Sequence, residues 1–166
     1  MIVAEVTGGD FCVAVYRDDE GWQAEVLPVV VTENLDAIIR ALRQQPGIAG
    51  AIGLVAVGDD FFVIVRVVGA QVVSVFLSDL TAAQEWPLAR QVLEYLDIPV
   101  PYAEELDQRL PAGDLSILAD LGVDEMELCA LSGDPELYPD EVLASLARRI
   151  GFWNAFDRAL DLVAGS

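Results

Sequence analysis

The sequence of 166 residues contains no histidine and no lysine, and it contains only two cysteines. Without histidine the chain cannot form a Ser-His-Asp or Cys-His nucleophile system or a histidine-ligated zinc site, and it lacks the usual general base. A zinc deaminase site is excluded as well, because it needs three cysteines, or one histidine with two cysteines. We therefore predict no catalytic residues and expect a protein that is not an enzyme.

The two cysteines, Cys12 and Cys129, stand among apolar neighbours and lack the paired spacing of a metal or redox motif. We expect both to be buried free thiols in a reducing compartment. The start of the sequence lacks the basic region of a signal peptide, and the longest apolar runs, residues 48–57 and 61–65, are too short to span a bilayer. These features predict a cytoplasmic protein without membrane contact.

Acidic residues are what the sequence has in excess, since 28 acids against 9 arginines give a formal net charge of −19. Charge of this size repels polyanions, and binding to a nucleic-acid backbone would need basic clusters that the sequence lacks. An anionic membrane surface is disfavoured for the same reason. The sequence therefore predicts a basic protein partner and no direct binding of nucleic acid.

Apolar runs separated by short acidic or glycine-containing turns predict five strands, at residues 11–16, 22–27, 51–57, 61–68 and 72–77. A helix is expected between the second and the third strand, where leucine and isoleucine recur at helical spacing. This order of elements favours an α+β protein with a mostly antiparallel five-stranded sheet. The fourth strand is apolar on both sides of its pleat, so we expect both faces of the sheet to be covered.

The second half of the sequence is helical in its pattern. One helix is predicted from Pro87, and four further helical stretches follow at residues 115–121, 125–131, 140–150 and 153–163.

Three regions are expected along the chain. They are a sheet domain at 1–98, a linker rich in proline and acid at 99–112, and a helical C-terminal region at 113–166. Packing of that last region on the sheet as part of one domain stays open.

Two patterns are similar to ligand sites. The acidic groups 18–20 and 59–60 could hold a divalent cation, but each lies in a predicted hairpin turn, where acids are common for local hydrogen-bonding reasons. Gly47, Gly50 and Gly53 form a GxxGxxG pattern like that of a nucleotide-binding loop. That fingerprint requires a strand before it and a helix after it, and here the order is reversed. We predict no metal site and no cofactor.

Residues near the C-terminus are candidates for partner contact. Trp153 and Phe156 lie in the last predicted helix and are the most plausible exposed pair, although any one aromatic residue here is more often core than interface. Arg148 and Arg149 stand at the C-terminal end of the preceding helix, where they mainly interact with the helix dipole, and partner contact is the second alternative. A homodimer through the terminal helix or an apolar sheet face is left open.

Four strings of residues carry a family resemblance. They are residues 76–79 (FLSD), 111–114 (PAGD), 118–122 (LADLG) and 138–152 (YPDEVLASLARRIGF). In this order and spacing the sequence resembles the tRNA adenosine deaminase-associated proteins of actinobacteria, over nearly its whole length. The resemblance implies association with the enzyme that converts wobble adenosine to inosine in tRNA. It implies no catalytic activity and no particular binding residues.

The preferred hypothesis is a non-enzymatic acidic interaction protein that modulates a tRNA adenosine deaminase. Two alternatives remain. One is a small-ligand-binding or acid-dependent enzyme domain with a site between sheet and helices, which converging carboxylates in a concave pocket would support. The other is a polyanion mimic that binds basic proteins in general.

Overall fold

The computed structural model of the chain describes residues 10–45, 50–69, 72–100 and 110–164. One antiparallel sheet of six strands forms its centre, in the order β2-β1-β3-β4-β5-β6. The strands are β1 (Phe11–Asp18), β2 (Gly21–Leu27), β3 (Ala51–Val57), β4 (Phe61–Val68), β5 (Val72–Leu77) and β6 (Ala112–Gly113). The α+β class and the antiparallel sheet are confirmed, and the number of strands is corrected from five to six.

The missed strand, β6, is two residues long and pairs with the end of β5 through Phe76↔Gly113 and Leu77↔Ala112. Two residues give no alternating pattern, and β6 overlaps the predicted linker 99–112. Gly113 has φ +103°, and a Cβ there would lie 2.3 Å from the Val75 carbonyl oxygen. Glycine is therefore required where the chain returns to the sheet edge. Residues 101–109 of the predicted linker lie outside the described residues.

In the described part of the chain, five α-helices of nine to twelve residues carry the rest of the fold, together with short 3₁₀ turns. The helical elements are η1 (Val29–Glu33), α2 (Leu35–Arg43), η2 (Leu80–Gln84), α3 (Pro87–Leu96), η4 (Ala119–Leu121), α4 (Glu125–Gly133), α5 (Pro139–Ile150) and α6 (Trp153–Ala164). Where a helix was predicted at 115–121, only the 3₁₀ turn η4 forms, and it ends at Gly122 in the left-handed conformation. None of the described helices is long and apolar enough to cross a membrane.

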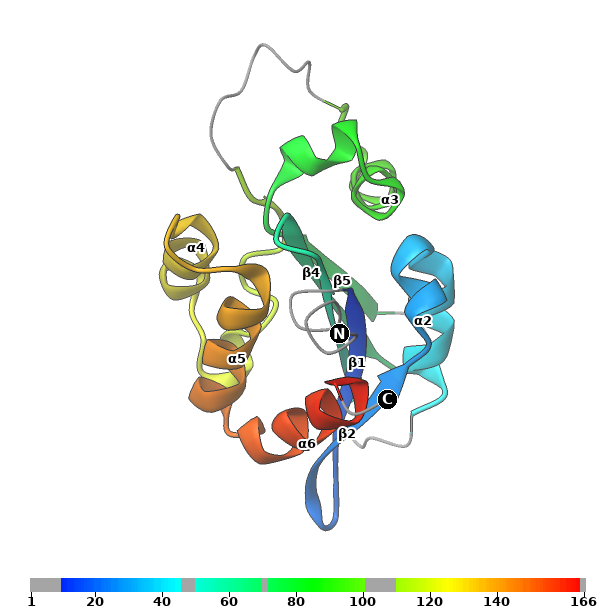
Figure 1. Cartoon of the computed structure of the whole chain (residues 1–166), viewed down its shortest axis with the longest axis vertical. Helices are drawn as coiled ribbons and strands as arrows, with labels where there is room; N and C mark the ends of the chain where they lie inside the picture. The colour runs from blue at the N-terminus through cyan, green and yellow to red at the C-terminus, as the bar shows by residue number, and fades with distance from the viewer. Residues whose placement is uncertain (1–9, 46–49, 70–71, 101–109, 165–166) are drawn as a thin grey trace.

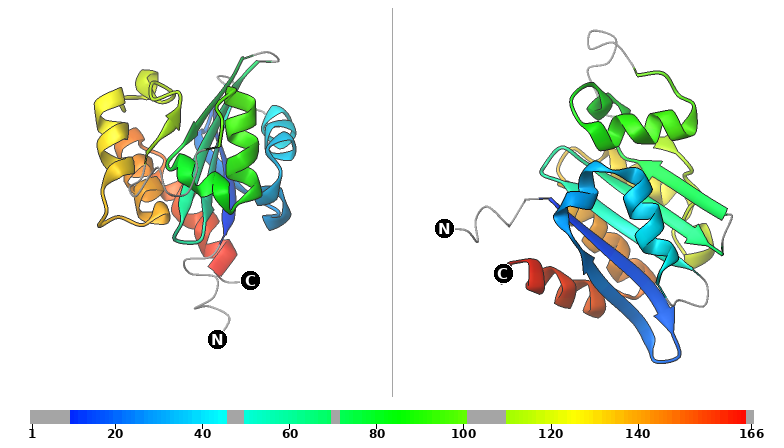
Figure 2. Two further views of the ribbon diagram at one scale, coloured as in Figure 1. Left: turned by 90° about the horizontal axis from the view of Figure 1, so that it is seen from above. Right: turned by 90° about the vertical axis from the view of Figure 1, so that its right-hand side faces the viewer.

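Helices cover both faces of the sheet. Figure 1 shows α2 and α3 on one side of it and α4, α5 and α6 on the other, and the left view of Figure 2 shows these layers from above. In β4, Phe61, Val63 and Val65 pack in the cluster under α2 and α3, whereas Phe62 and Ile64 pack in the cluster under the C-terminal helices. The prediction that both faces are covered is confirmed. Because one cluster joins sheet and C-terminal helices, we propose that the two regions form one domain.

Two of the three glycines in the GxxGxxG pattern serve chain packing. Gly50 has φ +89°, and a Cβ there would lie 2.0 Å from the Val67 carbonyl oxygen. Gly53 lies in β3 beneath α2, where a Cβ would be 3.1 Å from the Leu42 side chain. Gly47 lies outside the described residues. Gly50 is therefore required for close approach of the backbone, whereas a side chain at Gly53 would only crowd α2.

Candidate functional site

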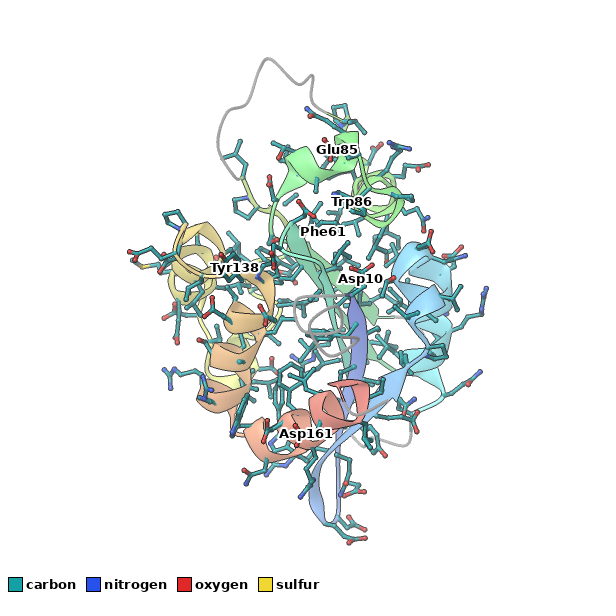
Figure 3. All side chains as sticks on the ribbon, in the orientation of Figure 1. Asp10, Phe61, Glu85, Trp86, Tyr138 and Asp161 are labelled. Atoms are coloured by element: carbon teal, nitrogen blue, oxygen red, sulfur yellow. The ribbon has the colours of Figure 1, made fainter. Side chains whose placement is uncertain are left out.

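A pocket of about 200 Å³ opens where the ends of β3 and β4 meet η1 and the first turn of α3. Figure 3 labels Asp10, Phe61, Glu85 and Trp86, which lie between α3 and the start of β1. The full lining consists of Asp10, Thr32, Glu33, Val57, Phe61, Glu85, Trp86, Pro87 and Leu88. Aromatic and aliphatic side chains therefore share this site with three carboxylates.

The apolar part of the pocket belongs to the core. Phe61, the first residue of β4, is 1% exposed, and its backbone pairs with Val57 at the end of β3. The half-buried indole of Trp86 packs on Phe61 with ring centroids 6.3 Å apart and an interplanar angle of 50°. Leu88, also buried, fixes the start of α3 against the same cluster. The pocket wall is therefore set by tertiary packing.

Backbone hydrogen bonds place the acidic residues at the pocket. The backbone N–H of Gly58 donates to Oδ1 of Asp10 at 2.9 Å, which holds that carboxylate against the β3–β4 turn. Gln91 of α3 receives a hydrogen bond from the backbone N–H of Leu35 (2.7 Å), and its own amide donates to the Glu33 carbonyl (2.9 Å). This pair of bonds ties the end of η1 to α3. Three elements distant in the sequence are thus held together around one hollow.

The acidic residues of the pocket have no basic residue among the described lining. Burial raises the pKa of Asp60, in the β3–β4 turn, and the charges of Glu85, Asp59 and Asp10 raise it further. The described lining of the pocket includes no arginine. Asp10, Glu33 and Glu85 are all exposed to solvent. The negative charges that act on Asp60 would favour a positively charged group nearby.

Three carboxylates and an apolar wall with one indole are the groups that line this site. The sequence supplies no imidazole, and Cys12 is fully buried, where burial raises the pKa of its thiol to about 12. A thiol of such high pKa is not a nucleophile near neutral pH. Within the described ranges, no group of three carboxylate or thiol side chains is arranged to hold a metal ion. An organic cation with an apolar stem matches the pocket's carboxylates and aromatic wall.

The cysteine predictions have different outcomes. Burial of Cys12 in β1 is confirmed, since its exposed fraction is 0%. The prediction for Cys129 is wrong, because this side chain is exposed. In α4 the buried residues are Leu128 and Ser132, which are four positions apart and share one helix face. Cys129 is the next residue after Leu128 and therefore points away from that face. An apolar neighbourhood in the sequence did not determine which side of the helix is covered.

Phe156, one of the candidate contact residues, lies in the core. Its side chain is 0% exposed and packs edge-on against Phe11 of β1 and Phe152, with ring centroids 6.2 Å apart in each case. Phe152, Phe156 and Ala159 all lie in the cluster under the C-terminal helices. The terminal helix therefore uses its aromatic face to cover the sheet.

The other three candidate contact residues lie at or near the surface. Trp153 is half-buried, and the Arg148 guanidinium lies over its ring, 4.2 Å from the centroid. Arg149 forms an ion pair with Glu127 of α4, with Nε and Oε2 2.9 Å apart. None of these residues is among those described as lining the pocket. Partner contact by Trp153, Arg148 and Arg149 stays a prediction.

Sequence reasoning did not find the pocket. Asp10, Glu33 and Glu85 each stand at or next to the boundary of an element, and they are separated by more than 20 residues in the sequence. Only the turn acids 59–60 were noted, and they lie in a turn as predicted. The sequence does show that these acids stand near the ends of elements. It does not show that they lie close together, because that depends on the order of the strands in the sheet.

Comparisons with known proteins give the family of the chain. The family model of the Rv3753c-like tRNA adenosine deaminase-associated protein matches residues 10–153, a span that includes every residue lining the pocket. Protein Rv3753c of Mycobacterium tuberculosis (strain ATCC 25618 / H37Rv) is 34% identical over 157 residues, which cover 93% of this chain and 90% of that protein. No solved structure matches the chain significantly. The chain therefore belongs to the family of Rv3753c-like tRNA adenosine deaminase-associated proteins.

Proposed function

We propose that this chain is a non-enzymatic interaction protein that binds a tRNA adenosine deaminase and modulates it. The observation that carries the proposal is the family match, whose description names association with this enzyme, over residues 10–153. The net charge of −19 and the uncompensated carboxylates at the pocket support a basic partner. We expect the two proteins to meet in the cytoplasm.

A physical argument connects the charge to the partner. An enzyme that modifies tRNA must attract a phosphate backbone, so it presents arginine and lysine on its surface. A strongly acidic protein is complementary to such a surface and is steered toward it at low ionic strength. We expect it to compete with tRNA for the same basic region, which is how a protein without catalytic residues would modulate the enzyme.

A second candidate function rests on the pocket itself. Carboxylates gather around an apolar hollow there, as expected for a small-ligand-binding or acid-dependent enzyme domain. The hollow of about 200 Å³ is smaller than the roughly 300–1,000 Å³ of most small-molecule sites. The acids at its rim are exposed. Both features favour contact with one side chain of a partner over turnover of an enclosed substrate.

The test is a calorimetric titration of the purified chain into the tRNA adenosine deaminase of the same organism, at low and at physiological salt, with and without tRNA. We expect binding that is tighter at low salt and that tRNA weakens. An unrelated basic protein of similar size serves as the control, and equal binding to it would indicate a general polyanion mimic. Absence of binding to the deaminase at both salt concentrations would contradict the proposal.

A further inference from the structure

We infer that the pocket between η1, β4 and α3 receives the side chain of an arginine on the surface of the partner protein. This inference rests on the proposed function, because it names the chemical group through which the basic partner is recognised. Its basis is the combination of an apolar aromatic wall, a hollow of limited volume and uncompensated negative charge at one place.

The walls of the pocket suit the shape of an arginine. A guanidinium group is planar, stacks on aromatic faces and carries a three-carbon apolar stem that can lie along other apolar groups. The half-buried indole of Trp86 supplies an aromatic surface at the pocket, and Phe61 supports it from below. The hollow of about 200 Å³ is small enough to favour one long side chain over a metabolite.

The charge of the pocket suits a cation. Asp10, Glu33 and Glu85 line it, and the like charges of Asp10 and Glu85 act on Asp60, the residue before the lining residue Phe61. A guanidinium placed among these groups would reduce the repulsion that acts on Asp60. Its nitrogens only donate hydrogen bonds, and carboxylates only accept them. The carboxylates could receive those donors in pairs, which is the geometry that arginine forms best.

The chain already pairs an acid with arginine in this way elsewhere. Arg66 of β4 donates from Nη1 to Oδ1 and from Nη2 to Oδ2 of Asp120, the second bond at 2.9 Å. At the pocket the acids are present and the described lining contains no arginine. The arginine missing from the pocket would come from the partner.

The frame of the pocket is fixed before binding. Gln91 joins Leu35 and Glu33 to α3, and the Gly58 N–H holds Asp10. Little ordering is then needed when the cation enters, which lowers the cost of association. Lysine fits less well, because its ammonium is a compact and strongly hydrated point charge that neither stacks nor forms paired bonds.

The first part of the test uses N-acetylarginine amide as the probe on the full chain, followed by NMR of the tryptophan indole N–H signals. The Trp86 signal is assigned from a Trp86→Phe variant. We expect saturable shifts at Trp86 with a dissociation constant in roughly the millimolar range, weaker shifts with N-acetyllysine amide, and none with the neutral citrulline analogue. Equal shifts with arginine and citrulline, or no shifts at all, would overturn the inference.

The second part compares two double variants in the deaminase titration. Glu33→Gln with Glu85→Gln removes two charges at the pocket, and Glu20→Gln with Glu136→Gln removes two exposed charges outside its lining. Thermal unfolding checks that both remain folded. We expect about a tenfold loss of affinity for the pocket variant and less than about a threefold loss for the control.

The outcomes separate the two proposals. Equal affinity of both double variants for the deaminase would overturn the arginine pocket and leave the proposed function standing. Binding of the arginine probe at Trp86 without any binding of the deaminase would contradict the proposed function, and the pocket would then be a site for a free guanidinium compound or another protein.

Discussion

Two aspartates of this chain have opposite electrostatic environments. Hydrogen bonding by the Arg66 side chain lowers the pKa of Asp120 on the face covered by the C-terminal helices. Partial burial and like charges raise the pKa of Asp60, the residue before Phe61 of the pocket lining. Ionised Asp120 therefore stabilises the fold, whereas ionised Asp60 does not. The acidic residues behind the net charge of −19 therefore differ in their effect on the stability of the fold.

Arg66, the partner of Asp120, is held by contacts with two segments of the chain. The Arg66 side chain is 12% exposed, and its Nη1 also donates to the carbonyl of Ile117 at 3.0 Å. It thereby ties β4 to the segment that precedes η4. At the pocket, Gln91 of α3 forms neutral hydrogen bonds to the backbone of Glu33 and Leu35. Replacing the carboxylates of Glu33 and Glu85 therefore leaves these hydrogen bonds in place.

The largest expected effect tests whether the terminal helix is structural. Replacing Phe156 by alanine should lower the free energy of unfolding by about 3–5 kcal/mol, because it leaves a cavity between α6 and β1. Trp153→Ala is the control: its half-buried side chain should cost only about 1–2 kcal/mol. Urea denaturation followed by circular dichroism measures both. A Phe156 variant no less stable than the Trp153 variant would show that α6 does not anchor the fold.

A smaller effect is expected from the ion pair itself. Arg66→Gln should cost about 1–3 kcal/mol, since it removes charged hydrogen bonds to Asp120 and one to Ile117. The control is Arg149→Gln, whose side chain is 57% exposed in its pair with Glu127, and which should cost at most about 0.5 kcal/mol. The comparison uses denaturant midpoints at neutral pH. Equal losses in the two variants would remove the distinction between structural and surface pairs.

The smallest effects test the opposite signs of the two pKa shifts. The folded-state pKa of Asp120 is lowered, so its stabilisation is present above the unfolded pKa and is lost as pH falls through the folded pKa. Asp120→Asn should therefore destabilise the protein at neutral pH, and the difference should shrink in acid.

The Asp60 carboxyl should behave in the reverse way. Its folded-state pKa is raised, so the ionised group is unfavourable above that pKa and has no effect below its unfolded value. Asp60→Asn should stabilise the protein at neutral pH, by no more than about 0.5 kcal/mol because the site is exposed, with no gain in acid. Unfolding midpoints across the acid-to-neutral range measure both. A loss of stability at neutral pH in the Asp60 variant would contradict the picture of uncompensated acids.

The central strands were predictable from the sequence, and contacts between distant segments were not. The predicted bounds of β3, β4 and β5 match the structure, because long β-branched runs end at turn residues. β6 was missed since a pairing of two residues depends on where the chain returns, not on periodicity. The burial of Phe156 and the exposure of Cys129 depend on which helix face meets the sheet. The pocket depends on the strand order that brings Asp10 and Glu85 into one lining.

The most direct test of this account is the salt dependence of the dissociation constant for the deaminase, measured with the natural chain and the two double variants. We predict that binding weakens steeply with salt for the natural chain and for Glu20→Gln with Glu136→Gln. The slope should be shallower for Glu33→Gln with Glu85→Gln. An affinity that does not change with salt, or three equal slopes, would contradict the claim that the acids at the pocket bind a cationic partner.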